Sequence, residues 1–280
     1  MFSLEKNIQT STNMKKFISL SGGVESTTMC ILYGKGATAI WADTGDEEDE
    51  LYERMDFLEG SLKDLHGGDF NLVRLKAKII AKGIECSTLE ELAIAWTYFP
   101  SPIARYCTAK LKIEPIDNFL KDQGDCELMI GFNADEEPNK DRTGNYMKCE
   151  NVSYTYPLYE NGLTRAECED ILNNYNLHPN FPIYMKRGGC RKCFYKGKSE
   201  LKAKCVFNPE GFAKDKDFEI EMNAKSNRKK FYHINMNAGM SYQAIEDEVN
   251  KEIVLWGLEV VKEMYNKTET HKPCGSFCHR

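Results

Sequence analysis

The feature that most constrains this chain is a pair of glycines between a predicted strand and a predicted helix. Residues 16–20 form an apolar run typical of a strand, Gly22 and Gly23 follow, and residues 26–33 predict a helix. Glycines let the backbone turn sharply and approach a ligand closely, and the free N–H groups at the start of a helix attract anions. The segment predicts a phosphate-binding loop, although a tight turn without a ligand would use the same glycines. Its other predicted ligand-binding residues are Ser19, Ser21, Glu25 and Ser26.

The first 178 residues alternate predicted strands with predicted helices. Further strands are predicted at 37–42, 71–75 and 127–132, and capping-box pairs at Ser87/Glu90 and Thr164/Glu167 predict helix starts. This alternation indicates an α/β, Rossmann-like fold with a parallel sheet sandwiched by helices. Ligands bind at the carboxyl ends of strands in such sheets. We therefore add the residues that follow the second and fourth strands to the predicted nucleotide site, namely Asp43, Thr44, Gly45 and Gly131.

The pattern changes after residue 178. Prolines, glycines and basic residues predict irregular chain to about residue 213, and Ser241 is expected to cap one long helix. An apolar stripe along that helix is predicted to pack on the rest of the protein; it consists of Tyr242, Ile245, Val249, Ile253, Trp256, Val260 and Met264. We expect a nucleotide-binding domain at 1–178 and a Cys-rich, mostly helical region at 179–280.

Composition restricts the class of protein. Hydrophobic residues make up 41% of the chain, the formal net charge is −6, and no apolar run reaches the ~20 residues of a membrane span. These values predict a cytoplasmic protein without a membrane partner. In a reducing compartment the 11 cysteines do not predict a disulfide framework. Five of them fall in predicted strands or helices and are expected to be buried or surface residues without a metal role, namely Cys30, Cys86, Cys126, Cys149 and Cys168.

Cys190 and Cys193 form a CxxC motif in a glycine-rich, basic segment, with Cys205 downstream. Two thiolates two residues apart can bind one metal centre from a single turn. The motif predicts a metal site, while a structural zinc completed by Cys205 and by Cys274 or Cys278 and a CxxC without metal are both kept as alternatives.

Several short segments occur in the order found in one known family. Residues 41–45 read WADTG and are followed by Glu50 and Tyr52; residues 106–115 read YCTAKLKIEP; and residues 131–135 read GFNAD and are followed by Arg142. From about residue 16 to 193 the chain resembles the phosphoadenosine phosphosulfate (PAPS) reductase family of the PP-loop ATP pyrophosphatase superfamily. The resemblance implies an adenine nucleotide alpha hydrolase-like fold with the nucleotide across the strand ends.

The resemblance also implies cofactors and their ligands. Reductases that bind a sulfonucleotide commonly lack the first glycine of the loop, so that the intact pair here favours ATP with Mg²⁺. The cations that would absorb charge on the phosphates are Arg105, Lys110, Lys112 and Arg142. Cys107, Cys190 and Cys193 match ligands of the family's [4Fe–4S] cluster; Tyr106 stands at the fourth position, and Cys205 is expected either to replace that ligand or to leave one iron open.

These features predict an enzyme that cleaves ATP between its α- and β-phosphates, adenylates a substrate and takes part in sulfur transfer. Its expected partners are a sulfur-donor protein or a nucleic acid, which would dock on the basic residues between Lys186 and Lys204. The first alternative is a true reductase that releases sulfite from PAPS or adenylylsulfate, with Cys274 as nucleophile and thioredoxin as partner. The second is a nucleotide-binding interaction protein without turnover. The oligomeric state is left open.

Overall fold

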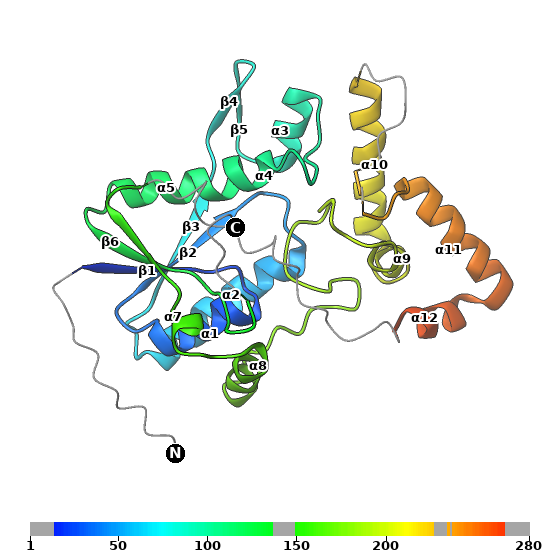
Figure 1. Cartoon of the computed structure of the whole chain (residues 1–280). Helices are drawn as coiled ribbons and strands as arrows, with labels where there is room; N and C mark the ends of the chain where they lie inside the picture. The colour runs from blue at the N-terminus through cyan, green and yellow to red at the C-terminus, as the bar shows by residue number, and fades with distance from the viewer. Residues whose placement is uncertain (1–13, 137–148, 227–233, 236, 267–280) are drawn as a thin grey trace.

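The main sheet is fully parallel and has five strands, in the order β3-β2-β1-β6-β7 (Figure 1). The computed structural model describes residues 14–136, 149–226, 234, 235 and 237–266. The strands are β1 (Lys15–Ser19), β2 (Thr38–Asp43), β3 (Asn71–Lys76), β6 (Cys126–Met129) and β7 (Val152–Thr155), and a separate hairpin consists of β4 (Ile79–Ala81) and β5 (Ile84–Cys86). The predicted α/β class with a parallel sheet is therefore confirmed.

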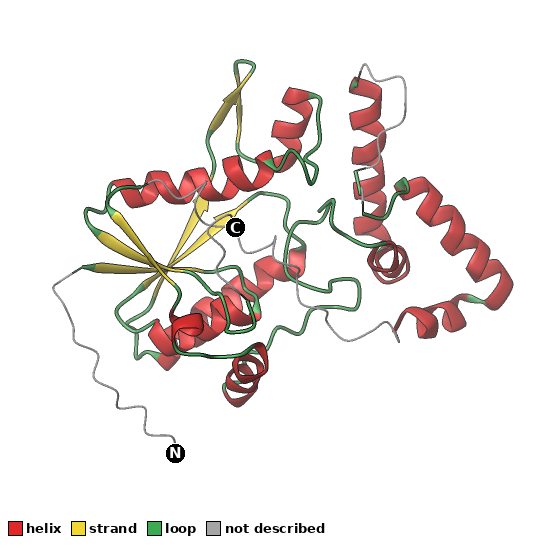
Figure 2. Cartoon of the chain, viewed as in Figure 1, coloured by secondary structure: helices red, strands yellow, loops and turns green. Residues whose placement is uncertain are grey.

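Helices cover both faces of this sheet (Figure 2). The helical elements of the described residues are α1 (Val24–Tyr33), α2 (Asp49–Leu65), α3 (Leu89–Trp96), α4 (Tyr106–Thr108), the π-helical turn η1 (Ala109–Ile113), α5 (Glu114–Lys121), α7 (Pro157–Glu160), α8 (Arg165–Asn174), α9 (Lys198–Phe207), α10 (Pro209–Lys225), α11 (Tyr242–Trp256) and α12 (Leu258–Asn266). Helices α9 to α12 lie beside the sheet and do not cover it (Figure 1). Among the described residues, no helix is long and apolar enough to cross a membrane.

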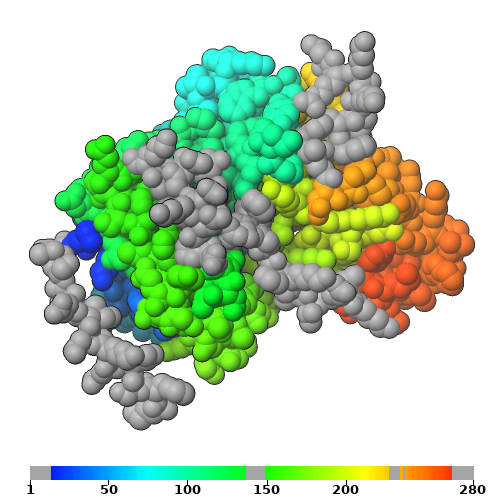
Figure 3. Space-filling view, viewed as in Figure 1, coloured from blue at the N-terminus to red at the C-terminus, as the bar shows by residue number. Residues whose placement is uncertain are grey.

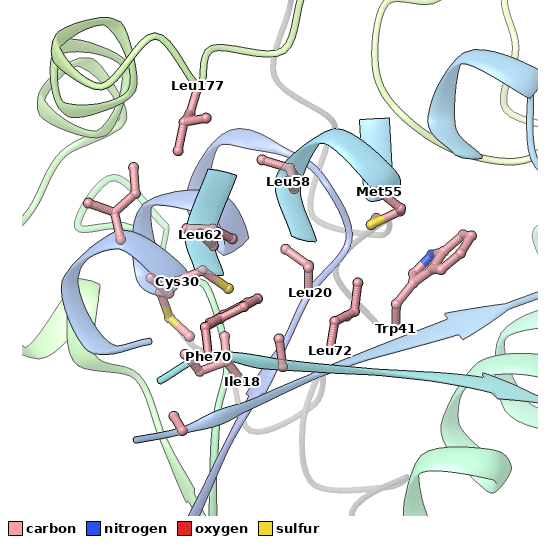
Figure 4. Packing of buried hydrophobic residues seen from close by; sticks show 14 of the residues in the cluster. Ile18, Leu20, Cys30, Trp41, Met55, Leu58, Leu62, Phe70, Leu72 and Leu177 are labelled. Atoms are coloured by element: carbon pink, nitrogen blue, oxygen red, sulfur yellow. The ribbon is translucent and has the colours of Figure 1, made fainter. Parts of the chain in front are cut away.

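Side chains that alternate along the strands fill two separate cores. Ile18 and Trp41 pack with α1, α2 and α8, whereas Phe17 and Ile40 pack with α5 on the other face. Figure 4 shows the first core, where Leu58 and Leu62 of α2 face the strand residues. A strand buried on both faces has this period-two division, which explains why the central strands read as nearly continuous apolar runs.

The strand order creates a crevice at the carboxyl end of β1. The chain passes from β1 to β2 and β3 on one side, and later returns to β6 and β7 on the other. In doubly wound sheets, the two connections that leave such a point in opposite directions open a gap that binds ligands. The twin-glycine loop directly follows β1 and therefore lies at this gap.

The C-terminal region differs from its prediction in two places. Residues 176–213 are not all irregular, because α9 and the first part of α10 lie within them. The predicted single helix is interrupted at Gly257, whose φ of 81° is outside the helical range, so α11 ends and α12 begins in a new direction (Figure 1). In Figure 3 these two helices form the orange and red surface on the right. The buried stripe consequently stops: Tyr242, Ile245 and Val249 are buried, but Trp256, Val260 and Met264 are 60%, 46% and 48% exposed.

Two smaller expectations have clear outcomes. The capping box Thr164/Glu167 is present at α8, but the box at α3 is Thr88/Glu91, one residue later than predicted, because Thr88 takes the extended N-cap conformation. The five cysteines expected to be structural are buried, namely Cys30, Cys86, Cys126, Cys149 and Cys168.

Helix α2 provides a test of the first core. Leu62 is fully buried, whereas Leu65 on the same helix is 39% exposed. We expect Leu62→Ala to lower the free energy of unfolding by about 2–5 kcal/mol because it removes buried methyl groups and leaves a cavity. Leu65→Ala is the matched control and should change it by less than about 1 kcal/mol. Urea unfolding monitored by circular dichroism measures both, and equal losses would contradict the described packing.

Glu219 of α10 makes stability depend on pH. Its side chain is 1% exposed and accepts hydrogen bonds from the backbone N–H groups of Ile234 (3.0 Å) and Tyr242 (2.8 Å). Burial raises the pKa of this carboxyl from 4.5 to about 7. The folded protein thus holds the proton more tightly than the unfolded chain, and the contribution of this group to stability falls as pH rises from 4.5 to about 7.

We expect Glu219→Gln to remove about 1–3 kcal/mol of that decline in the free energy of unfolding between pH 4.5 and 7.5. Glu221→Gln, on the same helix and 46% exposed in its pair with Lys225, is the control and should leave the decline intact. Urea titrations at several pH values test this, and a Glu219→Gln profile parallel to that of the wild type would contradict it.

Candidate functional site

The twin-glycine loop has a backbone conformation that favours glycine at its first position. Gly22 has a φ of 76°, which L side chains rarely adopt, and a Cβ there would lie 2.9 Å from the Cε of Met55 and 3.0 Å from the Cδ1 of Leu51. Gly23 is extended and is the N-cap residue of α1. The glycines therefore allow the loop to pack on α2 while the helix start faces the crevice.

The two serines of the loop, Ser21 and Ser26, are hydrogen-bonded to each other. The Ser21 N–H donates to the Oγ of Ser26 (3.1 Å), and the two hydroxyl oxygens are 3.0 Å apart. Gly131, at the end of β6, lies so close that a Cβ there would be 3.1 Å from the backbone nitrogen of Ser26. Glycine at 131 thus allows the chain after β6 to lie close to the first turn of α1.

Glu25 stands inside a small polar cluster. Its side chain is buried and its Oε1 accepts hydrogen bonds from Asn133 Nδ2 (3.0 Å) and Arg165 Nη1 (2.6 Å). Arg165 also donates to Glu169 (2.9 Å). The buried Glu25 carboxylate is consequently compensated by a cation from the first residue of α8.

A pocket opens at these strand ends and has both cationic and apolar lining residues. Six of the residues predicted for the nucleotide site line it, namely Ser19, Ser21, Gly23, Glu25, Ser26 and Gly131. The cationic lining residues are Lys112, Arg165, Lys186 and Arg187, and the apolar ones include Ile40, Trp41, Leu51, Ile116 and Phe181. A ligand that carries both an anionic group and an apolar ring would match this lining.

Asp43, Thr44 and Gly45, at the end of β2, shape the site without lining this pocket. The carboxylate of Asp43 accepts hydrogen bonds from the Gly45 N–H and the Tyr52 hydroxyl, both at 2.8 Å. The Thr44 hydroxyl donates to Glu47 Oε1 (2.8 Å), and Ala42 and Glu47 line the pocket in place of the three predicted residues. Asp43, Thr44 and Gly45 therefore fix the turn that presents their neighbours.

A second pocket adjoins the first and contains the thiol groups of three cysteines. Cys107, Cys190 and Cys193 line it together, although they come from α4 and from a segment more than 80 residues later. Cys205 does not line it: that thiol lies on α9, and its charged neighbours are Glu246 and Lys216. The structure thus brings together three of the four predicted metal ligands.

The donor types around this pocket can be compared with the predicted metal centres. Within the described part of the chain, no group of three or more His, Cys, Asp or Glu side chains is placed so that it could hold a metal ion. Thiolates are ligands both of structural zinc and of [4Fe–4S] clusters. The three cysteines that line the pocket are therefore of the donor type that either centre uses, and their placement does not distinguish the two.

Electrostatics distinguish the thiols from the adjacent lysine. Burial raises the pKa of Cys107 to about 11 and that of Cys190 well above its ordinary value. Burial alone would lower the pKa of Lys112, but the nearby Glu47 and the three thiols raise it. Lys112 Nζ lies 3.7 Å from Glu47 Oε1, and Lys112 lines both pockets. A charged ammonium therefore stands between the two pockets.

The CxxC segment is attached to the turn after β2. Cys190 pairs with Glu47 through an antiparallel bridge, and the Arg191 N–H donates to the carbonyl oxygen of Asp46 (2.7 Å). The ammonium of Lys192, which is fully buried, pairs with the carboxylates of Asp46 and Glu90. These contacts fix the two CxxC cysteines beside the first pocket.

The predicted cationic residues have different outcomes. Arg105 lines the second pocket, with its guanidinium 5.8 Å from the centre of the Tyr195 ring. Lys110 pairs with Glu114 (3.0 Å) and lines neither pocket. Arg142 and Cys274 lie outside the described residues.

Sequence reasoning missed Arg165 and Phe181 as pocket residues. One sequence signal could have pointed to Arg165: it directly follows the capping Thr164 and is therefore the first residue of a helix. The predicted nucleic-acid patch is wrong in part: Lys192, Lys196, Lys202 and Lys204 are buried and paired with carboxylates, and buried cations cannot contact a phosphate backbone.

Comparison with known proteins adds one relative. No protein-family model matches the chain. The chain is similar to an uncharacterized 37.8 kDa protein in the gpa 5′ region of Escherichia phage 186, with 25% identity over 255 residues that cover 75% of this chain and 76% of that protein. The aligned region thus covers most of both chains, and because the phage protein is described only as uncharacterized, the similarity does not indicate an activity.

Gly45 tests the turn between β2 and α2. Its φ is 68°, and a Cβ would lie 2.4 Å from the Cγ2 of Thr88. We expect Gly45→Ala to lower the free energy of unfolding by about 2 kcal/mol or more, because backbone strain and a clash act together. Gly83→Ala, where φ is 81° but no atom lies within 4 Å, is the control and should cost only about 1 kcal/mol. Urea unfolding measures the free energy of unfolding of both variants, and an equal decrease in the two would argue against the close contact between residue 45 and Thr88.

Proposed function

We propose that the chain binds ATP in the first pocket and cleaves it between the α- and β-phosphates to adenylate a substrate, which then undergoes sulfur transfer beside the three-cysteine pocket. The observation that carries the proposal is the shared wall of the two pockets: Lys112, Arg187, Gly188 and Gly189 line both. A group activated in one pocket would need to travel only across this wall to meet a thiol centre.

The nucleotide assignment is supported by the chemistry of the first pocket. Backbone N–H groups at the start of α1 and the hydroxyls of Ser21 and Ser26 suit a diphosphate. Lys112, Arg165 and Arg187 would balance the charge that builds up on it. The aromatic lining residues Trp41 and Phe181 suit an adenine ring.

The proposed reaction has two balanced steps. An oxygen of the substrate attacks the α-phosphorus, the bond to the β-phosphate oxygen breaks, and pyrophosphate leaves with the electron pair. A hydrosulfide-level sulfur then attacks the activated carbon, and AMP leaves with its oxygen. The protein's part is to hold the diphosphate and to keep cations at the oxygens that gain charge.

Cys107, Cys190 and Cys193 would hold a [4Fe–4S] cluster, with Arg105 and Lys112 compensating its negative charge. Such a cluster with three thiolate ligands has one iron free to bind an exogenous sulfur ligand. The Mg²⁺ that accompanies ATP would be held mainly by the phosphates.

The proposal is tested with anaerobically purified protein, ATP and Mg²⁺. Equilibrium dialysis should detect ATP binding, and Ser26→Ala should weaken it about tenfold because a hydroxyl that lines the loop is lost. Ser153→Ala, an exposed serine in β7, is the control. Turnover with RNA, DNA or small carboxylic acids plus hydrosulfide should yield AMP and pyrophosphate in equal amounts.

Three results would contradict the proposal. Absence of ATP binding would remove it, and ADP as the product would show cleavage at another bond. Release of sulfite from PAPS or adenylylsulfate, without use of ATP, would replace it with the reductase alternative. Iron and sulfide analysis decides the metal separately, and one bound zinc would exclude the cluster.

A further inference from the structure

Arg54 of α2 is a buried cation that joins two walls of the first pocket without lining it. Its side chain reaches the carbonyl oxygen of Gly22 through Nε (2.6 Å) and the carbonyl oxygen of Leu177 through Nη2 (2.9 Å). Nη2 also lies 3.3 Å from the hydroxyl oxygen of Thr27 in α1. Arg54 is 8% exposed, so its charge is satisfied by neutral oxygen acceptors inside the protein, which is an expensive arrangement to keep without a role.

The contact with Gly22 determines where the loop's N–H group points. The peptide between Gly22 and Gly23 is planar and trans, so its C=O and N–H point in opposite directions. Arg54 holds the C=O towards α2, and the Gly23 N–H is thereby directed away from α2. Gly23 lines the pocket and Gly22 does not, which agrees with this orientation.

The contact with Leu177 anchors the opposite wall. Leu177 precedes the segment that contributes His178, Pro179 and Phe181 to the pocket. The guanidinium carbon of Arg54 lies 5.9 Å from the centre of the Phe181 ring. The planar fork of one arginine therefore bridges two chain segments that are more than 150 residues apart.

We propose that Arg54 is a positioning residue that holds the Gly22–Gly23 peptide with its N–H group directed at the diphosphate of the ligand. The proposal rests on the nucleotide site proposed above. This role differs from the usual one, in which arginine contacts the phosphate itself. Arg54 contacts the carbonyl oxygen of Gly22 on the α2 side of the loop, and the anion would contact the Gly23 N–H on the pocket side.

Inorganic pyrophosphate and adenosine serve as separate probes of the site, measured by calorimetry well below the melting temperature. We expect Arg54→Met to weaken pyrophosphate binding at least about tenfold, since the amide is no longer held in place. Adenosine, which lacks phosphates, should lose less than about threefold. Arg74→Met is the control: Arg74 also faces an aromatic ring, that of Trp41 at 5.8 Å, but it is paired with Asp56 and Glu59 at the surface.

Arg54→Lys keeps the test decisive if Arg54→Met does not fold. A lysine ammonium can reach one of the two carbonyl oxygens but not both in the fork geometry, so we expect a pyrophosphate loss of about three- to tenfold with adenosine unchanged. Equal losses for both probes, or wild-type pyrophosphate binding in a folded variant, would overturn the proposal. If the wild-type protein bound neither pyrophosphate nor ATP, the proposed function would fail instead.

Discussion

The buried ion pairs of Lys192 and Lys204 determine how the CxxC segment and α9 pack against the chain after β2. Lys192 lies inside the CxxC motif and pairs with Asp46 from the turn after β2, while Lys204 of α9 pairs with Glu48 and Asp215. A buried charge is tolerated only when an opposite charge is paired with it. Removing one partner leaves the other charge buried without compensation, and the folded state then carries its full desolvation cost. The CxxC segment therefore has one favourable position, against the strand end, with the C-terminal helices packed behind it.

This arrangement gives the molecule two pockets instead of one. The parallel sheet alone provides a crevice at the carboxyl end of β1, as its strand order requires. The CxxC segment then closes one side of that crevice through Gly188 and Gly189 and places the thiols beyond them. The proposed chemistry depends on this adjacency, because neither the loop nor the cysteines would be informative alone.

One local irregularity explains why the cations were assigned only in part. Residues 109–113 form a π-helical turn, which contains more residues per turn than an α-helix. Lys112 faces both pockets, whereas Lys110 pairs with Glu114. A periodicity of 3.6 residues cannot reveal such a turn, so the sequence did not distinguish the two lysines.

The sequence by itself determined the parallel α/β fold and the glycine loop with its serines. These depend on local patterns: apolar runs, conformations open only to glycine, and residues adjacent in the chain. Only the tertiary structure decided that Cys107 joins Cys190 and Cys193 while Cys205 lies elsewhere, and that Arg165 compensates Glu25. It also decided that Trp256 is exposed. Contacts between distant segments depend on helix ends, strand order and buried charge pairs, which short-range patterns do not encode.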